Sequence, residues 1–163
     1  RNYQKVFAFI CRMIGDEASG EDLTQDVFMK LYGMKAAYQA RSKLTTLLFQ
    51  IARNASLNYL RSHKTHVSLD QEIQGEGSHL KQQVEDIKQT SVQQELEKEE
   101  LAKQIQLAIE ALPENQRTAI LLQRFEDMSY EEIATTMQMS LQAVKSLLNR
   151  AKENLKISLK HYF

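Results

Sequence analysis

Near the carboxyl end of the chain, residues 129–150 read SYEEIATTMQMSLQAVKSLLNR, a pattern that predicts two short helices joined by a tight turn. Ser129 stands three residues before Glu132, so its hydroxyl can cap the first helix while the carboxylate reaches back to the N–H of the cap. Ser140 can cap the second helix in a similar way. Small Ala134 lets the two helices approach closely. The apolar side chains expected in their shared core are Ile133, Met137, Met139 and Val144. The stretch therefore has the layout of a helix-turn-helix.

The second of these two helices carries hydrogen-bonding and cationic side chains on its outward face. They are Gln142, Lys145, Ser146, Asn149 and Arg150. A helix that enters the major groove of DNA needs side chains of these kinds, since it meets base edges and phosphates there. The pattern favours DNA binding. The alternative is an ordinary helical hairpin whose polar face is only solvated.

Apolar residues recur at spacings of three and four along most of the chain, which predicts helices rather than strands. Additional helices are expected at 3–14, 19–34, 44–61 and 95–111, and from Pro113 to about Phe125. Pro113 fits the first position of its helix, where its missing N–H is harmless. The residues expected to face inward are Val6, Phe9, Ile10, Met13, Leu23, Val27, Leu31, Met34, Leu44, Leu48, Ile51, Ala55, Leu101, Ile105, Ala108, Leu112, Ile120, Leu121, Phe125, Leu148, Ala151 and Leu155.

The composition is that of an ordinary globular chain, with 42% hydrophobic and 26% charged residues. One Pro and five Gly leave few residues for the many turns that a sheet protein needs, which favours an all-α fold. No run of 18 apolar residues exists, so we expect no membrane insertion. The lone Cys11 cannot form an internal disulfide, which favours a reducing cytoplasm. Because the chain begins at Arg1 without a signal-type apolar stretch, we expect a trimmed piece of a longer protein.

The net charge of zero hides blocks of opposite sign. Residues 1–66 hold ten Lys and Arg against five Asp and Glu, and residues 67–100 hold three against nine. Residues 101–163 hold eight against seven. The acidic middle also contains the GEGS run at 75–78 and few large apolar residues, which favours a linker over a merely solvated surface. The expected organisation is a three-helix or four-helix bundle at 1–66, an acidic flexible linker at 67–94 and a helix-turn-helix domain at 95–163.

Two separate parts of the chain carry specific motifs. Residues 109–156 include IEALPENQR, SYEEIA and AVKSLLNRAKENL. Residues 20–35 begin GEDLTQDVFMKLY and are followed by IARN at 51–54 and LNYLR at 57–61. These parts resemble the fourth and second conserved regions of the extracytoplasmic-function (group IV) sigma factors, in the family's order. The resemblance implies a factor that directs RNA polymerase to promoters, with no catalytic residue, metal or cofactor.

The same resemblance implies which side chains meet the polymerase. In the family, the helix with the DLTQ motif docks on the clamp helices of the largest polymerase subunit. The matching candidates are Asp22, Gln25, Asp26, Phe28 and Lys30. The second domain is expected on the flap of the second-largest subunit. Many relatives are also controlled by an anti-sigma factor, and the sequence leaves open whether this chain is.

The helix beginning near Leu44, with the loop before it, resembles the element that melts the −10 region and captures an unstacked base. Such capture needs cations for phosphates and planar or amide groups for bases. The candidates are Arg41, Lys43, Arg53, Asn54, Asn58 and Arg61. For Tyr38 and Tyr59, packing in the core is at least as good an interpretation as base contact. The outward set at 142–150 would read the −35 duplex.

Three positions depart from the family's pattern. Leu47 stands where a Trp is usual, so an apolar role survives and a stacking role does not. Gln138 replaces a turn Gly, and since the left-handed conformation costs a non-Gly residue about 1–2 kcal/mol, we expect a different turn. Leu147 replaces an Arg, so one DNA contact is expected to be missing.

Other functions compete with this one. A helix-turn-helix regulator would bind duplex DNA without polymerase, and an adaptor would bind only proteins. His63 and His66 have a spacing that can hold zinc on a helix, but no second ligand pair accompanies them in the sequence. No phosphate loop, nucleophile elbow or zinc-protease motif occurs, so we expect no enzyme.

Overall fold

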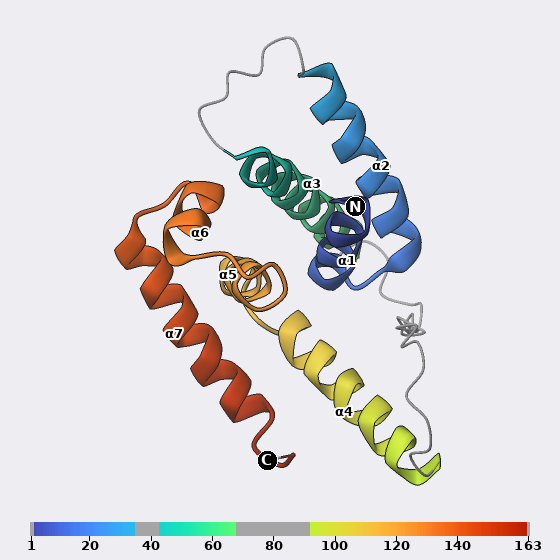
Figure 1. Ribbon diagram of the computed structural model, residues 1–163. Helices are drawn as coiled ribbons and strands as arrows, with labels where there is room; N and C mark the ends of the chain where they lie inside the picture. Colours follow the sequence, from blue (N-terminus) through green and yellow to red (C-terminus); the bar gives the residue numbers. More distant parts are fainter. Residues whose placement is uncertain (1, 35–42, 68–91, 163) are drawn as a thin grey trace.

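The computed structural model describes residues 2–34, 43–67 and 92–162. Within these ranges the chain forms seven helices and no strand, which confirms the all-α expectation. The helices are α1 (Asn2–Ile14), α2 (Glu17–Gly33), α3 (Leu44–Val67), α4 (Val92–Glu110), α5 (Glu114–Arg124), α6 (Tyr130–Met137) and α7 (Leu141–Ser158) (Figure 1). Most of the expected linker, residues 68–91, lies outside the described residues. None of the described helices is both long and apolar enough to span a membrane.

Helices α1, α2 and α3 form a bundle in which each helix packs on the other two. The predicted apolar face of α1 is buried, with Val6, Phe9, Ile10 and Met13 at most 1% exposed. Phe9 meets the ring of Phe49 from α3 edge-on, with the ring centroids 5.4 Å apart. The first bundle is therefore built on the stripe that the periodicity predicts.

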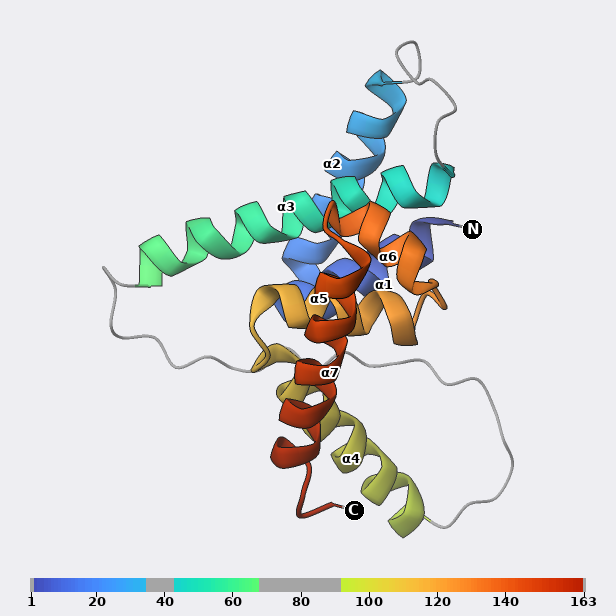
Figure 2. The ribbon, with the colours of Figure 1, turned by 90° about the vertical axis from the view of Figure 1, so that its left-hand side faces the viewer.

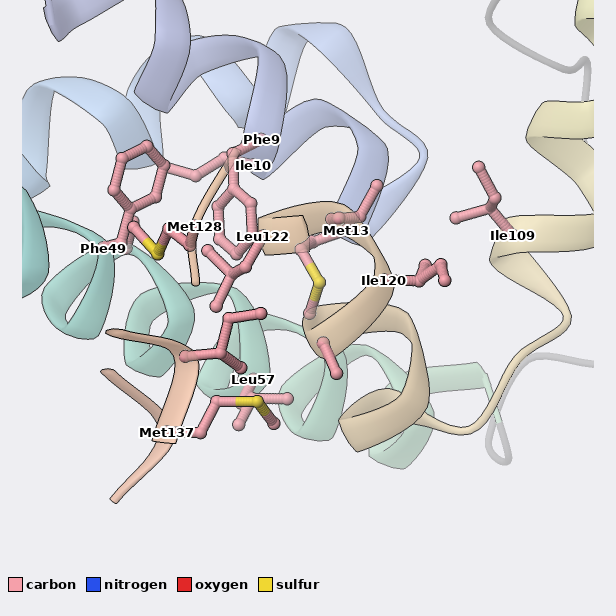
Figure 3. Close-up of a cluster of buried hydrophobic side chains, with 14 of the residues drawn as sticks. Phe9, Ile10, Met13, Phe49, Leu57, Ile109, Ile120, Leu122, Met128 and Met137 are labelled. Carbon is pink, nitrogen blue, oxygen red and sulfur yellow. The ribbon is translucent and has the colours of Figure 1, made fainter. Parts of the chain in front are cut away.

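Helix α5 occupies the centre of the remaining helices. It contacts α1, α6 and α7, and all seven residues from Gln116 to Leu122 are buried. A helix that is buried on all sides belongs to the interior of a structure. The buried side chains form one continuous cluster that joins the first bundle to the later helices (Figure 3).

Three apolar side chains expected inside are exposed. Met34 and Leu44 are 42% and 47% exposed, and they lie just after the last residue of α2 and at the first residue of α3. Phe125, just after α5, is 44% exposed. Periodicity identifies the stripe of a helix but does not say where along the stripe the neighbouring helices stop.

The helix ends follow their capping side chains. Asp16 accepts a hydrogen bond from the N–H of Ala18 at 3.2 Å, so α2 begins at Glu17 rather than near Ser19. We expected Pro113 at the first helical position, where its missing N–H is harmless, but it is the N-cap residue of α5, one position earlier. Helix α3 continues past the expected end at Arg61 to Val67.

Candidate nucleic-acid and polymerase interfaces

The start of α6 is capped as the sequence predicts, but the turn that follows the helix differs from the expectation. Ser129 Oγ accepts from the N–H of Glu132 at 3.1 Å, and the N–H of Ser129 donates to Glu132 Oε2 at 2.8 Å. Gln138 adopts the left-handed conformation, with φ 55° and ψ 47°, and its N–H closes the end of α6. The expected change in the turn was therefore wrong: Gln138 takes up the strained conformation that Gly adopts freely.

Helix α7 presents the outward set predicted for DNA. Ser140 caps the helix through a hydrogen bond from the N–H of Ala143 at 3.1 Å. Val144, Leu148 and Ala151 are buried against α5 and α6. On the other side Gln142, Lys145, Asn149 and Arg150 are exposed, and Ser146 is half-buried. A rigidly capped helix thus carries two cations and two amides on one accessible face.

Leu147, which replaces the usual Arg, packs against the core cluster and is half-buried. Leu47 on α3 is half-buried in the same way, which agrees with the apolar role expected of it. Neither side chain joins an exposed reading face.

The −10 candidates on α3 divide into two groups. Asn54, Asn58 and Arg61 are exposed. Lys43 and Arg53 instead contact the later helices: Lys43 Nζ lies 2.7 Å from Glu132 Oε1, and Arg53 Nη2 donates to Asn115 Oδ1 at 3.1 Å. Arg41 and Tyr38 lie outside the described residues.

Arg53 is in an unusual setting for a surface cation. The pKa of the Arg53 guanidinium is lowered, most by desolvation on burial and further by repulsion from Arg61. Its Nε is buried without a hydrogen-bond partner among the described residues. Leaving a donor unpaired is costly, so the contact with Asn115 satisfies Arg53 only in part.

Tyr59 serves the bundle rather than a base. Its hydroxyl donates to Ser19 Oγ at 3.1 Å, and its ring stacks on His63 with the centroids 4.1 Å apart. These contacts favour the packing interpretation of Tyr59 over base contact.

Among the described residues no group of three or more His, Cys, Asp or Glu is placed to hold a metal ion.

The outer face of α2 carries the polymerase-docking candidates. Asp22, Gln25, Asp26 and Lys30 are exposed, whereas Phe28 is half-buried and stacks on Tyr3 at 5.5 Å. Sequence reasoning missed two large side chains on this helix, Met29 and Tyr32, which are 72% and 78% exposed. Met29 follows Asp22, Gln25 and Asp26 at helical spacing, and that spacing is the signal that places it on their face.

Comparison with known proteins supports the arrangement of motifs. The family model described as sigma-70 region 2 matches residues 1–66, and the one described as sigma-70 region 4 matches residues 102–155. The RNA polymerase sigma-H factor of Pseudomonas aeruginosa is 31% identical over 154 residues, which cover 91% of this chain and 77% of that protein. The ECF RNA polymerase sigma factor SigM of Bacillus subtilis is 32% identical over 151 residues, covering 93% and 86%.

A solved structure resembles the whole arrangement of helices. The sigma factor RpoE of Bartonella quintana, in complex with the anti-sigma factor NepR, matches with a TM-score of 0.74 and 25% identity. The match covers 97% of this chain and 91% of that one.

Proposed function

This chain belongs to the sigma-70 family, in its extracytoplasmic-function group, and we propose how its two matched parts share promoter recognition. As an RNA polymerase sigma factor it binds core polymerase and directs promoter-specific transcription initiation. In our proposal residues 1–66 dock on polymerase and open the −10 region, residues 95–163 bind the −35 duplex, and residues 67–94 join them. In this proposal the protein acts by recognising polymerase and promoter DNA and catalyses no reaction. A cytoplasmic location follows from the polymerase that it serves.

We propose that α7 reads the −35 duplex in the major groove. The observation that carries this proposal is its exposed face of Gln142, Lys145, Asn149 and Arg150 on a helix that is capped at Ser140. Arg can pair with a guanine through two hydrogen bonds, and Gln or Asn can do the same with adenine. Ser146 lies beside Arg150 on this face and completes the set. Leu147 is turned into the core and takes no part in reading.

We propose that the exposed side of α3 captures the displaced −10 strand. Asn54 and Asn58 are amides that can meet base edges, and Arg61 is a cation beside them. Lys43 and Arg53 are the additional cations for the strand, and Arg41 is assigned to it by resemblance alone. Binding that favours only the unpaired strand shifts the promoter toward its open state.

We propose that the outer face of α2 docks on the clamp helices of the largest polymerase subunit. Asp22, Gln25, Asp26 and Lys30 supply exposed polar groups, and Phe28 lies at their edge. Exposed Met29 adds an apolar side chain to the same face. The second part is assigned to the flap of the second-largest subunit by family resemblance. Because the Bartonella relative was solved with an anti-sigma factor, we propose one as a partner here too.

A run-off transcription assay tests these roles together. The protein is added to core polymerase on a pool of promoters with random −35 and −10 elements, and the transcripts are sequenced. We expect enrichment of defined elements at both positions. A regulator that binds duplex DNA alone would bind the pool without initiating, and a protein adaptor would do neither.

A further inference from the structure

We propose that the side chains of Gln116 and Asn154 fix the rotation of α7 on α5, and that selectivity for the −35 sequence depends on this pair. Both are positioning residues in this proposal, because they act through the reading face of α7 and bind no DNA themselves. The inference rests on the proposed role of α7 as the reader of the −35 duplex. It adds two side chains that are not part of the reading face.

An amide–amide hydrogen bond links α5 to the C-terminal half of α7. Asn154 Nδ2 donates to Gln116 Oε1 at 2.8 Å. Gln116 is buried, at 9% exposed, in the helix that lies at the centre of the later helices. Between α5 and α7, both of which the structure describes in full, no other side-chain hydrogen bond is found. The pair therefore supplies a directional contact between the two helices.

The buried face that α7 presents to its neighbours is otherwise apolar. It consists of buried Val144, Leu148 and Ala151, with half-buried Leu155 at its end. Figure 2 shows α7 crossing α5 and continuing beyond it. Apolar contacts are not directional, so this face by itself tolerates a small rotation of the helix.

A polar pair restricts such a rotation. A hydrogen bond weakens steeply when its distance and angle depart from their preferred values. A buried amide oxygen that loses its partner is costly. A single polar group within an apolar contact can therefore select one arrangement, as a buried Asn does when it fixes the register of paired helices.

The pair lies about one helical turn beyond the last reading residue. Ser146, Arg150 and Asn154 are four residues apart, so they follow one strip of α7. At 1.5 Å per residue, Asn154 lies about 6 Å along the axis from Arg150. The capping bond at Ser140 holds the start of the helix, and the bond to Gln116 holds it just after the reading residues. The reading segment is thus held by a hydrogen bond at each end.

The size of a base contact decides how much a rotation matters. A side-chain end lies about 5–6 Å from the helix axis, so a rotation of about 20° displaces it by about 2 Å. Hydrogen bonds to base edges need donor–acceptor distances of about 2.7–3.2 Å. Such a displacement breaks the paired bonds that Arg150 can make to a guanine. Attraction to phosphate acts over longer distances and is lost less readily. Loss of the pair should therefore reduce sequence selectivity more than overall DNA binding.

The test replaces both amides by apolar side chains of similar shape, in the double variant Gln116→Met with Asn154→Leu. Removing both partners leaves no unpaired polar group, so the fold should be as stable as before or more stable. A swapped variant, Gln116→Asn with Asn154→Gln, keeps an amide pair and the same total side-chain length. Ser158→Leu is the matched control, because Ser158 is exposed and lies four residues beyond Asn154 on the same strip.

The measurement is the ratio of run-off transcripts that each full-length protein, with core polymerase, makes from two promoters. They share one −10 element, and they carry either a −35 element enriched from the randomised pool or a scrambled one. We expect the apolar double variant to lower the ratio about tenfold, or about 1.4 kcal/mol, which is in the range of one bidentate base contact. Its urea unfolding should show no loss of stability. The swapped variant should recover most of the ratio, and Ser158→Leu should match the unsubstituted protein.

Three results overturn the proposal. They are an unchanged ratio in the folded apolar double variant, an equal fall of the ratio in Ser158→Leu, and a swapped variant that is as unselective as the apolar one. A pair with only a structural role would change unfolding and leave the ratio intact. If the apolar double variant does not fold, Asn154→Ala is judged by the same ratio, since Asn154 is exposed and its truncation removes no apolar core contact.

Arg150→Ala separates this proposal from the one on which it rests. If Arg150→Ala relaxes the −35 preference and the apolar double variant does not, α7 remains the reader and only the positioning role is wrong. If Arg150→Ala leaves the preference unchanged, the reading role of this residue is wrong and the positioning proposal falls with it. When both relax it, adding the apolar pair to Arg150→Ala should lower the ratio by much less than tenfold, and a full further tenfold loss contradicts action through Arg150.

Discussion

Gly20 faces Cys11 where α2 crosses α1, and a side chain at position 20 has no room. A Cβ built on Gly20 would lie 2.5 Å from Cys11 Sγ, far closer than real Cβ contacts. Both residues are buried, so the helices cannot simply let the methyl group into solvent. We predict that Gly20→Ala destabilises the protein, although Ala is the better helix former.

The magnitude follows from two opposed effects. Overpacking a tight core costs about 1–3 kcal/mol. Replacing Gly by Ala inside a helix returns about 1 kcal/mol. The net loss for Gly20→Ala is therefore up to about 2 kcal/mol. In a Cys11→Ala background the sulfur is gone, and the same substitution should stabilise by about 1 kcal/mol. The effect of one methyl group is thus expected to change sign with its neighbour.

Urea unfolding followed by helical circular dichroism measures the four proteins of this cycle. Gly33→Ala is the matched control, because a Cβ at Gly33, also in α2, meets nothing within 4 Å. We expect the control to be neutral or stabilising in both backgrounds. The same loss for Gly20→Ala with and without the Cys11 sulfur would refute the close approach of α1 and α2.

Three further predictions concern binding and pH. Asp22→Ala should weaken binding to core polymerase by about 1.5–3 kcal/mol with helix content unchanged, and a pull-down with equal recovery would contradict the docking role. Arg150→Ala should cost about 1–3 kcal/mol at a matched −35 site and relax sequence preference, whereas Lys145→Ala should weaken all sequences alike if it meets only phosphate; competition between matched and scrambled duplexes separates the two, and unchanged selectivity in both variants would remove α7 as the reader. The hydrogen bond from Ser19 lowers the pKa of Asp16 below its ordinary 3.8. The stabilisation that the Asp16 carboxylate gives to the folded state is therefore present above the pKa of this group in the unfolded chain, and it is lost as pH falls through its pKa in the folded protein. Ser19→Ala should reduce this acid dependence in unfolding experiments between neutral and acidic pH, and an unaltered profile would count against it.

Local pattern was enough to predict the helices and the capped turn. The stripe of α1 could be read because each of its inward residues is apolar and the spacing of three and four is unbroken. The burial of Met34, at the end of α2, and of Leu44, at the start of α3, was misjudged, since the sequence does not tell where a neighbouring helix stops covering the stripe.

Pairings across the chain could not be read from the sequence. Lys43 and Glu132 are 89 residues apart, and no periodicity links a cation to one particular carboxylate at that distance. Arg117 looks like a surface cation in the sequence, because the carbonyls of Met13 and Leu112 that accept its hydrogen bonds are main-chain groups with no side-chain signature. The sequence alone therefore could not distinguish cations that pair within the protein from cations that stay exposed, and the fold was needed to tell them apart.

The burial of α5 has a consequence for how the protein opens. Because Gln116–Leu122 are enclosed by helices from both matched parts, the amide hydrogens of α5 should exchange with solvent among the slowest in the chain. Because the core is continuous, the two parts of the chain should unfold in a single cooperative transition and not as two independent domains. If core polymerase docks on α2 as proposed and thereby moves the first bundle away from α5, hydrogen exchange at α5 should accelerate.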